Sequence, residues 1–370
     1  MTQQELTLYN LGENLDQLMN LDPRGYGVCR ILYPAARALA KEPLTIHGAK
    51  FLVSNIKGGE LVYIITGFVL LPFKKAEMDG IVSSVLLARS LIKAFGAKPV
   101  LICPEENLKA AKALTSVAGM HCYESVEEVQ QFPISMGLIS FPKDRESALL
   151  VTDQLIAKGL PAAVITNEAP GANAKGIYHN STGLDVTDLE AKTDLLFEKL
   201  QQLGVPNLSI GDLGNEIGMG ALEEQLNRYV PYTAPGACRC GCKGGIAAAT
   251  KADHILTATV SDWGCYGLMA ALSYLKRDID VFHTPEMERE ALTVACRNDV
   301  IDMYGWLIPA IDGMNAEKNC SIVSLMRECV FSAMDLEKTC ATWFDKVLEL
   351  GYYDNIADIK IPKDRLSSNQ

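Results

Sequence analysis

The sequence predicts a three-layer α/β fold, in which a mostly parallel, Rossmann-like sheet has helices on both faces and extra helices near both ends of the chain. Two observations support this prediction. Apolar runs of strand length alternate with helical patterns through most of the chain, and this alternation is typical of parallel sheets covered by helices. The runs are almost continuously apolar, as expected for strands that are buried on both faces.

The predicted elements follow one another in a regular order. Apolar residues in the first segment recur at the spacing of one helix face: Leu11, Leu15, Leu18 and Met19. A second helical segment covers 28–40, and we expect it to break near Pro34 because proline interrupts helical hydrogen bonds. Predicted strands cover 61–65, 99–103, 138–141, 162–166, 207–210 and 254–260. Predicted helices cover 81–95, 105–116, 145–158, a segment capped by Asp185 or Thr187 that ends at 203, 264–275, 285–296 and 320–351.

These elements divide the chain into three parts. Residues 1–57 form a helical segment packed on the main domain, residues 58–315 form the α/β domain, and residues 316–370 form a helical C-terminal extension. The helices at the two ends are free to pack together, and the polar tail 361–370 is expected to fray.

Composition excludes several classes of protein. The chain has 370 residues, of which 48% are hydrophobic and 21% charged, as in ordinary globular proteins. A net charge of −11 argues against nonspecific binding to nucleic acid. The longest apolar run, 61–73, is too short to span a bilayer. The N-terminus lacks a basic signal region and an arginine-rich transit pattern, so a cytoplasmic location is expected.

The most informative stretch is 208–226, where an apolar strand ends in a glycine-spaced turn and a helical pattern follows. Glycines allow the backbone to approach a ligand closely, and a helix N-terminus presents free N–H groups. Asp212, Asn215 and Glu216 lie within the turn, and carboxylates at this position would repel a phosphate. The turn also lacks the spacing of the dinucleotide and P-loop motifs. It therefore favours a small polar substrate or a cation over a nucleotide.

Three further strand ends carry glycine together with polar side chains. They are 66–68, 167–171 and 261–264, and in a parallel sheet all would meet the 211–216 turn at one edge. This convergence is the main evidence from the residues for an active site. The substrate-binding candidates at or near these ends are Thr66, Gly67, Asp79, Gly171, Asn180, Gly214, Asn215, Ser261, Asp262 and Trp263.

Each candidate also has a structural interpretation. Acids that follow strands are often helix N-caps, and this applies to Asp212 and Asp262; Asp79 is equally well explained as a helix start. Glu168 precedes Ala-Pro-Gly and is not placed to cap a helix, so a role in the site is favoured. Trp263 is more often a packing residue, and lone histidines such as His179 have little functional weight.

The chain has 11 cysteines, of which only Cys238, Cys240 and Cys242 form a cluster. A zinc site usually needs a second pair of ligands, and no complementary pair is evident in the sequence. A redox pair is more often Cys-x-x-Cys. The preferred interpretation is a glycine-rich loop that carries thiols near the site, in which Lys243 could bind a carboxylate.

At these residues the sequence resembles a known family. Residues 211–220, Gly-Asp-Leu-Gly-Asn-Glu-Ile-Gly-Met-Gly, resemble the G-D-G-G-N-E-I-G-M-G signature of the D-glutamate cyclase family, in the module that forms the C-terminal half of its longer members. Further blocks that agree are 21–25, 66–68, 79–80, 168–171, 242–247 and 260–264. Three residues depart from the family: Leu213 replaces a glycine, Asp262 replaces an asparagine, and Ala169 stands where arginine is common.

The resemblance implies a hydro-lyase that interconverts D-glutamate with 5-oxo-D-proline and water. Such a reaction requires a base, an acid and stabilisation of an oxyanion. The resemblance suggests Glu216 or Asp212 as the base and Glu168 as the acid, while Asn215 and the N–H groups of residues 214–216 hold the oxyanion or a substrate carboxylate. Alternatively, Asp212 and Glu216, with Asn215, bind Mg²⁺ or Mn²⁺, which prefer oxygen ligands.

Two other functions stay open. One is a noncatalytic module that binds a small amino or oxo acid, and the other is a metal-dependent enzyme acting on phosphates or nucleotides. We expect a small amino or oxo acid as the ligand, no nucleic-acid or membrane partner, and either a monomer or a homo-oligomer.

Overall fold

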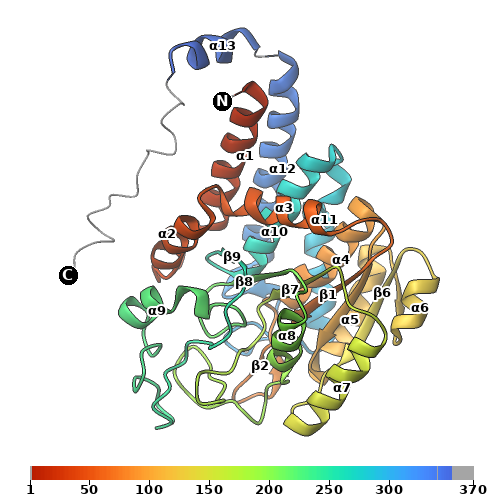
Figure 1. Ribbon diagram of the computed structural model, residues 1–370, viewed down its shortest axis with the longest axis vertical. Coiled ribbons are helices and arrows are strands. Elements are labelled where there is room, and N and C mark those ends of the chain that lie inside the picture. The colour runs from red at the N-terminus through yellow and green to blue at the C-terminus, as the bar shows by residue number, and fades with distance from the viewer. Residues whose placement is uncertain (1, 340, 352–370) are drawn as a thin grey trace.

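The computed structural model describes residues 2–339 and 341–351, and its centre is a seven-stranded sheet (Figure 1). Each pair of neighbouring strands in this sheet is parallel. The strands are, in sheet order, β5 (His121–Tyr123), β6 (Ser135–Ser140), β4 (Lys98–Cys103), β1 (Leu61–Thr66), β7 (Ala163–Asn167), β8 (Asn207–Gly211) and β9 (His254–Thr257). The predicted three-layer, Rossmann-like α/β fold is therefore confirmed.

The middle of the sheet is buried on both faces. Every residue of β1, β7 and β8 is buried, which explains why β1 and the first part of β7 are continuously apolar. In β8 the polar Asn207 and Ser209 are also buried, and they are hydrogen-bonded to Asp253 and to Thr166. In the register, Ile64 is opposite Leu101 on one side and Ile165 on the other. The continuous apolar runs thus fix the strands in the core.

Helices cover both faces. The connections that step from β1 toward β5 contain α4 (Ile81–Phe95) and α5 (Glu105–Ala118), and those that step back contain α6 (Val126–Gln131), α7 (Arg145–Ala157) and α8 (Thr193–Gln202). Right-handed crossovers place these two sets on opposite faces. The contacts agree, because α4 packs against α5 and α10 (Ser261–Lys276), while α7 packs against α8.

The terminal helices form a second packed region. The N-terminal helices are α1 (Gln3–Met19), α2 (Cys29–Ala40) and α3 (Leu44–Asn55), and the C-terminal ones are α11 (Pro285–Arg297), α12 (Ala316–Thr339) and α13 (Ala341–Glu349). Figure 1 shows α1 and α12 side by side, extending away from the sheet, and the contacts agree. The helix bounds fit the proposed parts 1–57 and 316–370, but whether these are separate units stays a prediction. The tail 361–370 lies outside the described residues.

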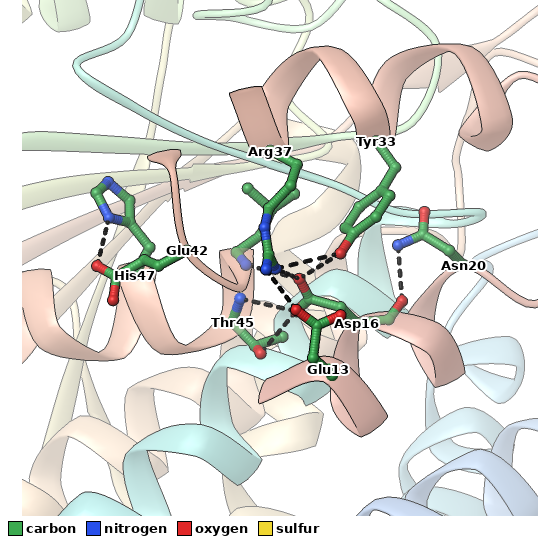
Figure 2. A network of polar contacts seen from close by, with 9 residues as sticks. Glu13, Asp16, Asn20, Tyr33, Arg37, Glu42, Thr45 and His47 are labelled. Atoms are coloured by element: carbon green, nitrogen blue, oxygen red, sulfur yellow. Dashed lines mark hydrogen bonds and ion pairs between the residues drawn. The ribbon is translucent and has the colours of Figure 1, made fainter. Parts of the chain in front are cut away.

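The three N-terminal helices are joined by a network of polar contacts around Asp16, shown in Figure 2. The buried Asp16 carboxylate accepts hydrogen bonds from the Leu44 N–H (2.7 Å) and the Thr45 N–H (3.0 Å) at the start of α3. It also accepts them from the Thr45 and Tyr33 hydroxyls and from the Arg37 guanidinium, which pairs with Glu13 as well. Asp16 therefore caps α3 and connects it to α1 and α2.

The predictions for α2, β9 and α8 are wrong, each for a local reason. The helix α2 continues through Pro34, because the ring removes a single bond while Leu32 and Ala36 stay buried. Strand β9 ends at Thr257, before the chain turns into α10. The α8 helix begins at Thr193, since Asp185 accepts the Thr187 N–H within a loop turn instead of capping a helix.

The remaining elements are short. The antiparallel pairs are β2 (Val69–Leu70) with β3 (Lys75–Ala76) and β10 (Ala310–Ile311) with β11 (Met314–Asn315). Two 3₁₀ helices, η1 (Gly220–Leu222) and η2 (Ile279–Val281), and the helix α9 (Glu223–Tyr229) complete the chain. Within the described residues, every helix is too short or too polar to cross a membrane.

Candidate active site

The predicted convergence of strand ends is confirmed. Strands β1, β7, β8 and β9 are consecutive neighbours in the parallel sheet, so the segments that follow them meet at one edge. The chain leaves β1 toward β4 on one side, and β7 lies on the other side. This change of direction is the switch point where α/β proteins bind ligands.

A cavity of about 270 Å³ opens near this edge. It is small compared with ligand pockets in general, which occupy about 300–1,000 Å³, and therefore fits a small metabolite better than a nucleotide. Its polar lining includes several acids and, among the described residues, one basic side chain. The lining residues used below are Arg24, Tyr26, Glu77, Glu168, Asn180, Ser181, Asp212, Asn215 and Asp312.

The turn after β8 is shaped by Glu216. Its fully buried carboxylate accepts the N–H groups of Asp212 (2.9 Å), Leu213 (2.8 Å) and Gly214 (2.6 Å). Gly214 has a φ of 117°, and a Cβ there would lie 2.3 Å from a Leu226 methyl, so the turn requires glycine. Glu216 is thus placed beneath the turn and does not line the cavity.

Asn215 connects the turn to the loop after β7 at two points. Its carbonyl accepts the Gly171 N–H (2.9 Å), and its side-chain amide donates to the His179 carbonyl (3.0 Å). The next residues after His179, Asn180 and Ser181, line the cavity beside Asn215. Asn180 uses its own side-chain oxygen to accept N–H groups of its loop.

Glu168 follows β7 at the switch point and has an unusual backbone. Its φ of 46° is in the left-handed region, which non-glycine residues rarely adopt outside functional or strained positions. The carboxylate accepts a hydrogen bond from the Ser261 hydroxyl (2.6 Å). Burial, followed by the charges of Asp212 and Glu216, raises the pKa of Glu168 well above its ordinary value. These surroundings favour the protonated form of Glu168.

Asp79 and Asp262 cap each other's helices. Asp79 accepts the N–H groups of Ser261 and Asp262 at the start of α10, and Asp262 accepts those of Gly80 and Ser83 at the start of α4. Burial, and then the charges of Asp262 and Glu168, raise the pKa of Asp79 well above its ordinary value. Both carboxyls support the site from behind, and neither lines the cavity.

Asp212 faces further acids across the cavity. Burial, and then the charges of Asp312 and Glu216, raise its pKa well above the ordinary value, while Arg24 opposes this effect. The Arg24 guanidinium donates to Asp312 (2.5 Å) and to the Thr259 carbonyl (2.7 Å), and it lies 4.8 Å from the centre of the Tyr26 ring. Its buried Nε has no hydrogen-bond partner among the described residues. One cation thus balances several carboxyls.

Sequence reasoning missed Arg24, Glu77 and Asp312 as site residues. Arg24 lies in the 21–25 block of the family resemblance, which is a usable signal. Glu77 does not directly follow any strand of the main sheet, and Asp312 is in the two-residue turn between β10 and β11, so nothing in the local pattern marks them.

Several candidates are placed away from the cavity lining. Thr66, Gly67 and Gly171 are buried under the loops, where a Cβ on Gly67 would lie 2.8 Å from Asn107 and one on Gly171 2.8 Å from Ala248. Trp263 is buried and donates to Asn319 (2.8 Å). Lys243 is exposed in the cysteine loop and does not line the cavity. Direct substrate contacts by these residues stay untested predictions.

Two groups of carboxyls have the geometry of a cation site. The ligand atoms of Glu168, Asp212 and Glu216 lie within 4.8 Å of one another, and so do those of Asp79, Asp212 and Asp312. Asp212 belongs to both groups. Oxygen ligands of this kind suit Mg²⁺ or Mn²⁺.

Comparison with known proteins shows the family of this chain. The model of the family described as D-glutamate cyclase-like, C-terminal, matches residues 15–327. The human protein named D-glutamate cyclase, mitochondrial, is 31% identical over 113 residues, which are 30% of this chain and 17% of that protein. The alignment thus covers a small part of the human enzyme, and the family match covers most of this chain. The chain belongs to the D-glutamate cyclase-like, C-terminal family.

Proposed function

We propose that this protein is a D-glutamate cyclase-like hydro-lyase that interconverts D-glutamate with 5-oxo-D-proline and water. The observation that carries the proposal is the pair of acids Glu168 and Asp212. Both line one small cavity at the switch point of the sheet, and burial among other acids raises the pKa of each. Acid–base catalysis at neutral pH uses carboxyls of this kind.

The proton balance of the reaction fits two carboxyls. Ring closure forms a C–N bond between the α-amine and the carbon of the γ-carboxyl group and breaks one C–O bond of that group. The ammonium loses two protons, and the departing oxygen gains two to leave as water. We assign Asp212 as the base that takes one proton from the amine and Glu168 as the acid that gives one to the oxygen. The second proton that leaves the nitrogen and the second that reaches the oxygen are exchanged with solvent.

Glu216 has a different role in this proposal. Its carboxylate accepts three backbone N–H groups of the turn, so it positions Asp212 and Asn215 and does not act as the base. The Gly214 N–H is one of these donors and therefore does not hold the oxyanion. Arg24 and the Asn215 side chain remain to bind the substrate carboxylate and the developing charge. Arg24 would replace the arginine that is absent at Ala169.

A divalent cation at these acids is the alternative to their acid–base role, because a carboxyl that binds a metal ion is deprotonated. The cavity contains more acids than bases, while glutamate itself carries two carboxylates, so repulsion must be offset. Asp212 together with Glu168 or Asp312 provides oxygen ligands for Mg²⁺ or Mn²⁺. Such an ion would neutralise the carboxyls and polarise the substrate carboxyl.

The other two functions are less well supported. A phosphate or nucleotide would face Glu77, Glu168, Asp212 and Asp312 in a small cavity, which disfavours it. A noncatalytic acid-binding module needs no pair of carboxyls with raised pKa values. A cytoplasmic location and the oligomeric state remain predictions, and the name of the human relative gives a mitochondrial location for that protein.

The test is NMR of the purified chain with D-glutamate and, separately, 5-oxo-D-proline, in EDTA, Mg²⁺ or Mn²⁺. We expect interconversion of the D-enantiomers, with L-glutamate as the control substrate, and faster turnover with the cation. Ligand-induced shifts without conversion would indicate a binding module or an incomplete enzyme. Neither shifts nor conversion would contradict the proposed substrate.

A further inference from the structure

Apart from the acidic cavity, four metal-ligating side chains converge where two loops meet. The ring nitrogen of His179 and the sulfurs of Cys238, Cys240 and Cys242 all lie within 4.8 Å of one another. His179 comes from the loop after β7, and the cysteines come from the loop after α9. We propose that these four residues bind one Zn²⁺ ion in a structural site.

The distances between ligand atoms match a tetrahedral zinc ion. His179 Nε2 lies 3.1 Å from the Cys240 sulfur and 3.7 Å from the Cys242 sulfur. The Cys238 sulfur lies 3.5 Å from that of Cys242 and 3.8 Å from that of Cys240. With Zn–S near 2.3 Å and Zn–N near 2.0–2.1 Å, a tetrahedron separates its ligand atoms by about 3.6–3.8 Å. One ion at the centre would contact all four.

The loop conformation brings the sulfurs together. In an extended chain, alternate residues are about 6.6 Å apart, so a Cys-x-Cys-x-Cys segment would spread its thiols. Here the chain turns back on itself, with left-handed φ values of 78° at Gly241 and 61° at Lys243. The two sulfurs at the ends of the segment are consequently in contact. The left-handed turn at Gly241 thus brings the three cysteine sulfurs together, which the Cys-x-Cys-x-Cys spacing alone would not do.

Backbone and side-chain N–H groups contact two of the sulfurs. The Cys242 N–H donates to the Cys240 sulfur (3.4 Å), and the Gly244 N–H donates to the Cys242 sulfur (3.3 Å). The Asn173 amide approaches the Cys242 sulfur at 3.5 Å and also donates to the Gly245 carbonyl. Such outer contacts orient metal ligands and stabilise their charge. The sulfurs are therefore already held by donors that suit a bound metal.

The ligand set and its spacing favour zinc over other groups. Three thiolates and one imidazole form a closed set without an open position, as in structural zinc sites. An iron–sulfur cluster would place its own iron and sulfide atoms between the cysteines, and sulfurs this close leave room for one ion. The described cysteines are all free, so none of these three is in a disulfide.

The zinc site would hold one wall of the acidic cavity. The His179 carbonyl accepts the Asn215 amide, and the next residues, Asn180 and Ser181, line the cavity. The Arg239 N–H also donates to the Gly183 carbonyl (2.8 Å), which ties the two loops together again. Zinc would thus order the 173–185 loop, whichever reaction the cavity supports.

The first measurement is the metal content of the protein purified from zinc-supplemented medium without chelators. We expect about one zinc per chain in the wild type and less than about a tenth in His179→Ala, Cys238→Ser and Cys242→Ser. The matched control is Cys122→Ser on the edge strand β5, which should retain full zinc content. Wild-type protein without zinc, or ligand variants with full zinc, would overturn the proposal.

A second measurement on the wild type avoids variants that fail to fold. Exchange of the metal for Co²⁺ should produce sulfur-to-cobalt charge-transfer absorption and the visible bands of a tetrahedral ion. Chelation should abolish both, expose three additional thiols to a thiol reagent and increase hydrogen exchange in residues 173–185. Folded protein that takes up Co²⁺ without charge-transfer absorption, or none at all, would contradict cysteine ligation.

Discussion

Two groups of buried carboxyls in this protein have opposite surroundings. The Asp16 carboxylate receives hydrogen bonds from two backbone N–H groups, two hydroxyls and the Arg37 guanidinium (Figure 2). Asp212 instead faces Asp312 and Glu216, and Glu168 faces Asp212 with one hydrogen bond from Ser261. Satisfied polar groups strengthen a fold, whereas crowded acids destabilise it and are retained for chemistry.

The largest expected effect concerns activity. Glu168→Gln removes the proposed acid while keeping an oxygen that can accept the Ser261 hydroxyl, so we expect turnover to fall by about 10²–10⁴-fold. The melting temperature should stay the same or rise, because a buried acid beside Asp212 is replaced by a neutral amide. Kinetics and thermal unfolding measure both, with the exposed Glu146→Gln as the control. Unchanged turnover would remove Glu168 from the mechanism.

The largest expected effect on stability is at Asp16, in the hydrogen-bonded network of the N-terminal helices. Asp16→Ala removes the carboxylate that accepts hydrogen bonds from the Arg37 guanidinium and from the first N–H groups of α3. We therefore expect the free energy of unfolding to fall by about 3–5 kcal/mol. Urea unfolding compares this variant with Asp153→Ala, an exposed position on α7. A loss below about 1 kcal/mol would mean that the network is not structurally important.

The same group predicts a pH dependence. Burial, only partly opposed by the Thr45 and Leu44 hydrogen bonds, raises the pKa of Asp16 from 3.8 to about 6. Between these values the folded protein retains a proton that the unfolded chain has lost, so stability falls as pH rises from about 4 to about 6. This shift in the pKa of Asp16 corresponds to a change of about 3 kcal/mol in the free energy of unfolding across that pH range.

The pocket acids act in the same direction, so the measurement must isolate Asp16. Unfolding free energies of the wild type and Asp16→Asn, measured between pH 4 and 7, should differ in slope, with the steeper decline in the wild type. Parallel curves for the two proteins would contradict the raised pKa of Asp16.

A smaller effect on stability is expected at Glu216. Its carboxylate is satisfied by hydrogen bonds, like that of Asp16, but it also lies beside Asp212. Glu216→Gln places an NH₂ group against a turn that supplies three N–H donors, so at least one donor loses its acceptor. We expect a loss of about 1–3 kcal/mol of stability and reduced turnover, because Asp212 shifts. Loss of turnover with full stability would instead restore Glu216 as a catalytic base.

The sequence predicts the sheet and its functional edge well. The run at 61–65 is apolar throughout and those at 162–166 and 207–210 largely so, as expected for buried parallel strands, so the strand pattern places Glu168 and Asp212 at one edge. The glycines around Asp212 indicate a tight turn. Sequence patterns are sufficient to predict the structure wherever a strand, a turn and a helix follow one another directly in the chain.

Sites assembled from distant segments could not be predicted in this way. Arg24 and Asp312 meet although 288 residues separate them, and His179 reaches Cys240 from 61 residues away. No periodicity relates such positions, since their contact depends on how loops pack on the finished sheet. The predicted start of α8 is wrong for a different and local reason, because the Asp185 side chain accepts the Thr187 N–H within a loop turn and the helix begins only at Thr193.

The most direct test of the account compares Asp212→Asn with the wild type and with Asp153→Asn in two measurements, conversion of D-glutamate followed by NMR and thermal unfolding. If Asp212 is kept for chemistry, its variant loses conversion by about 10²-fold or more and melts at the wild-type temperature or above. Wild-type conversion, or a loss of stability comparable to that of Asp16→Ala, would show that Asp212 is a structural residue and contradict the account.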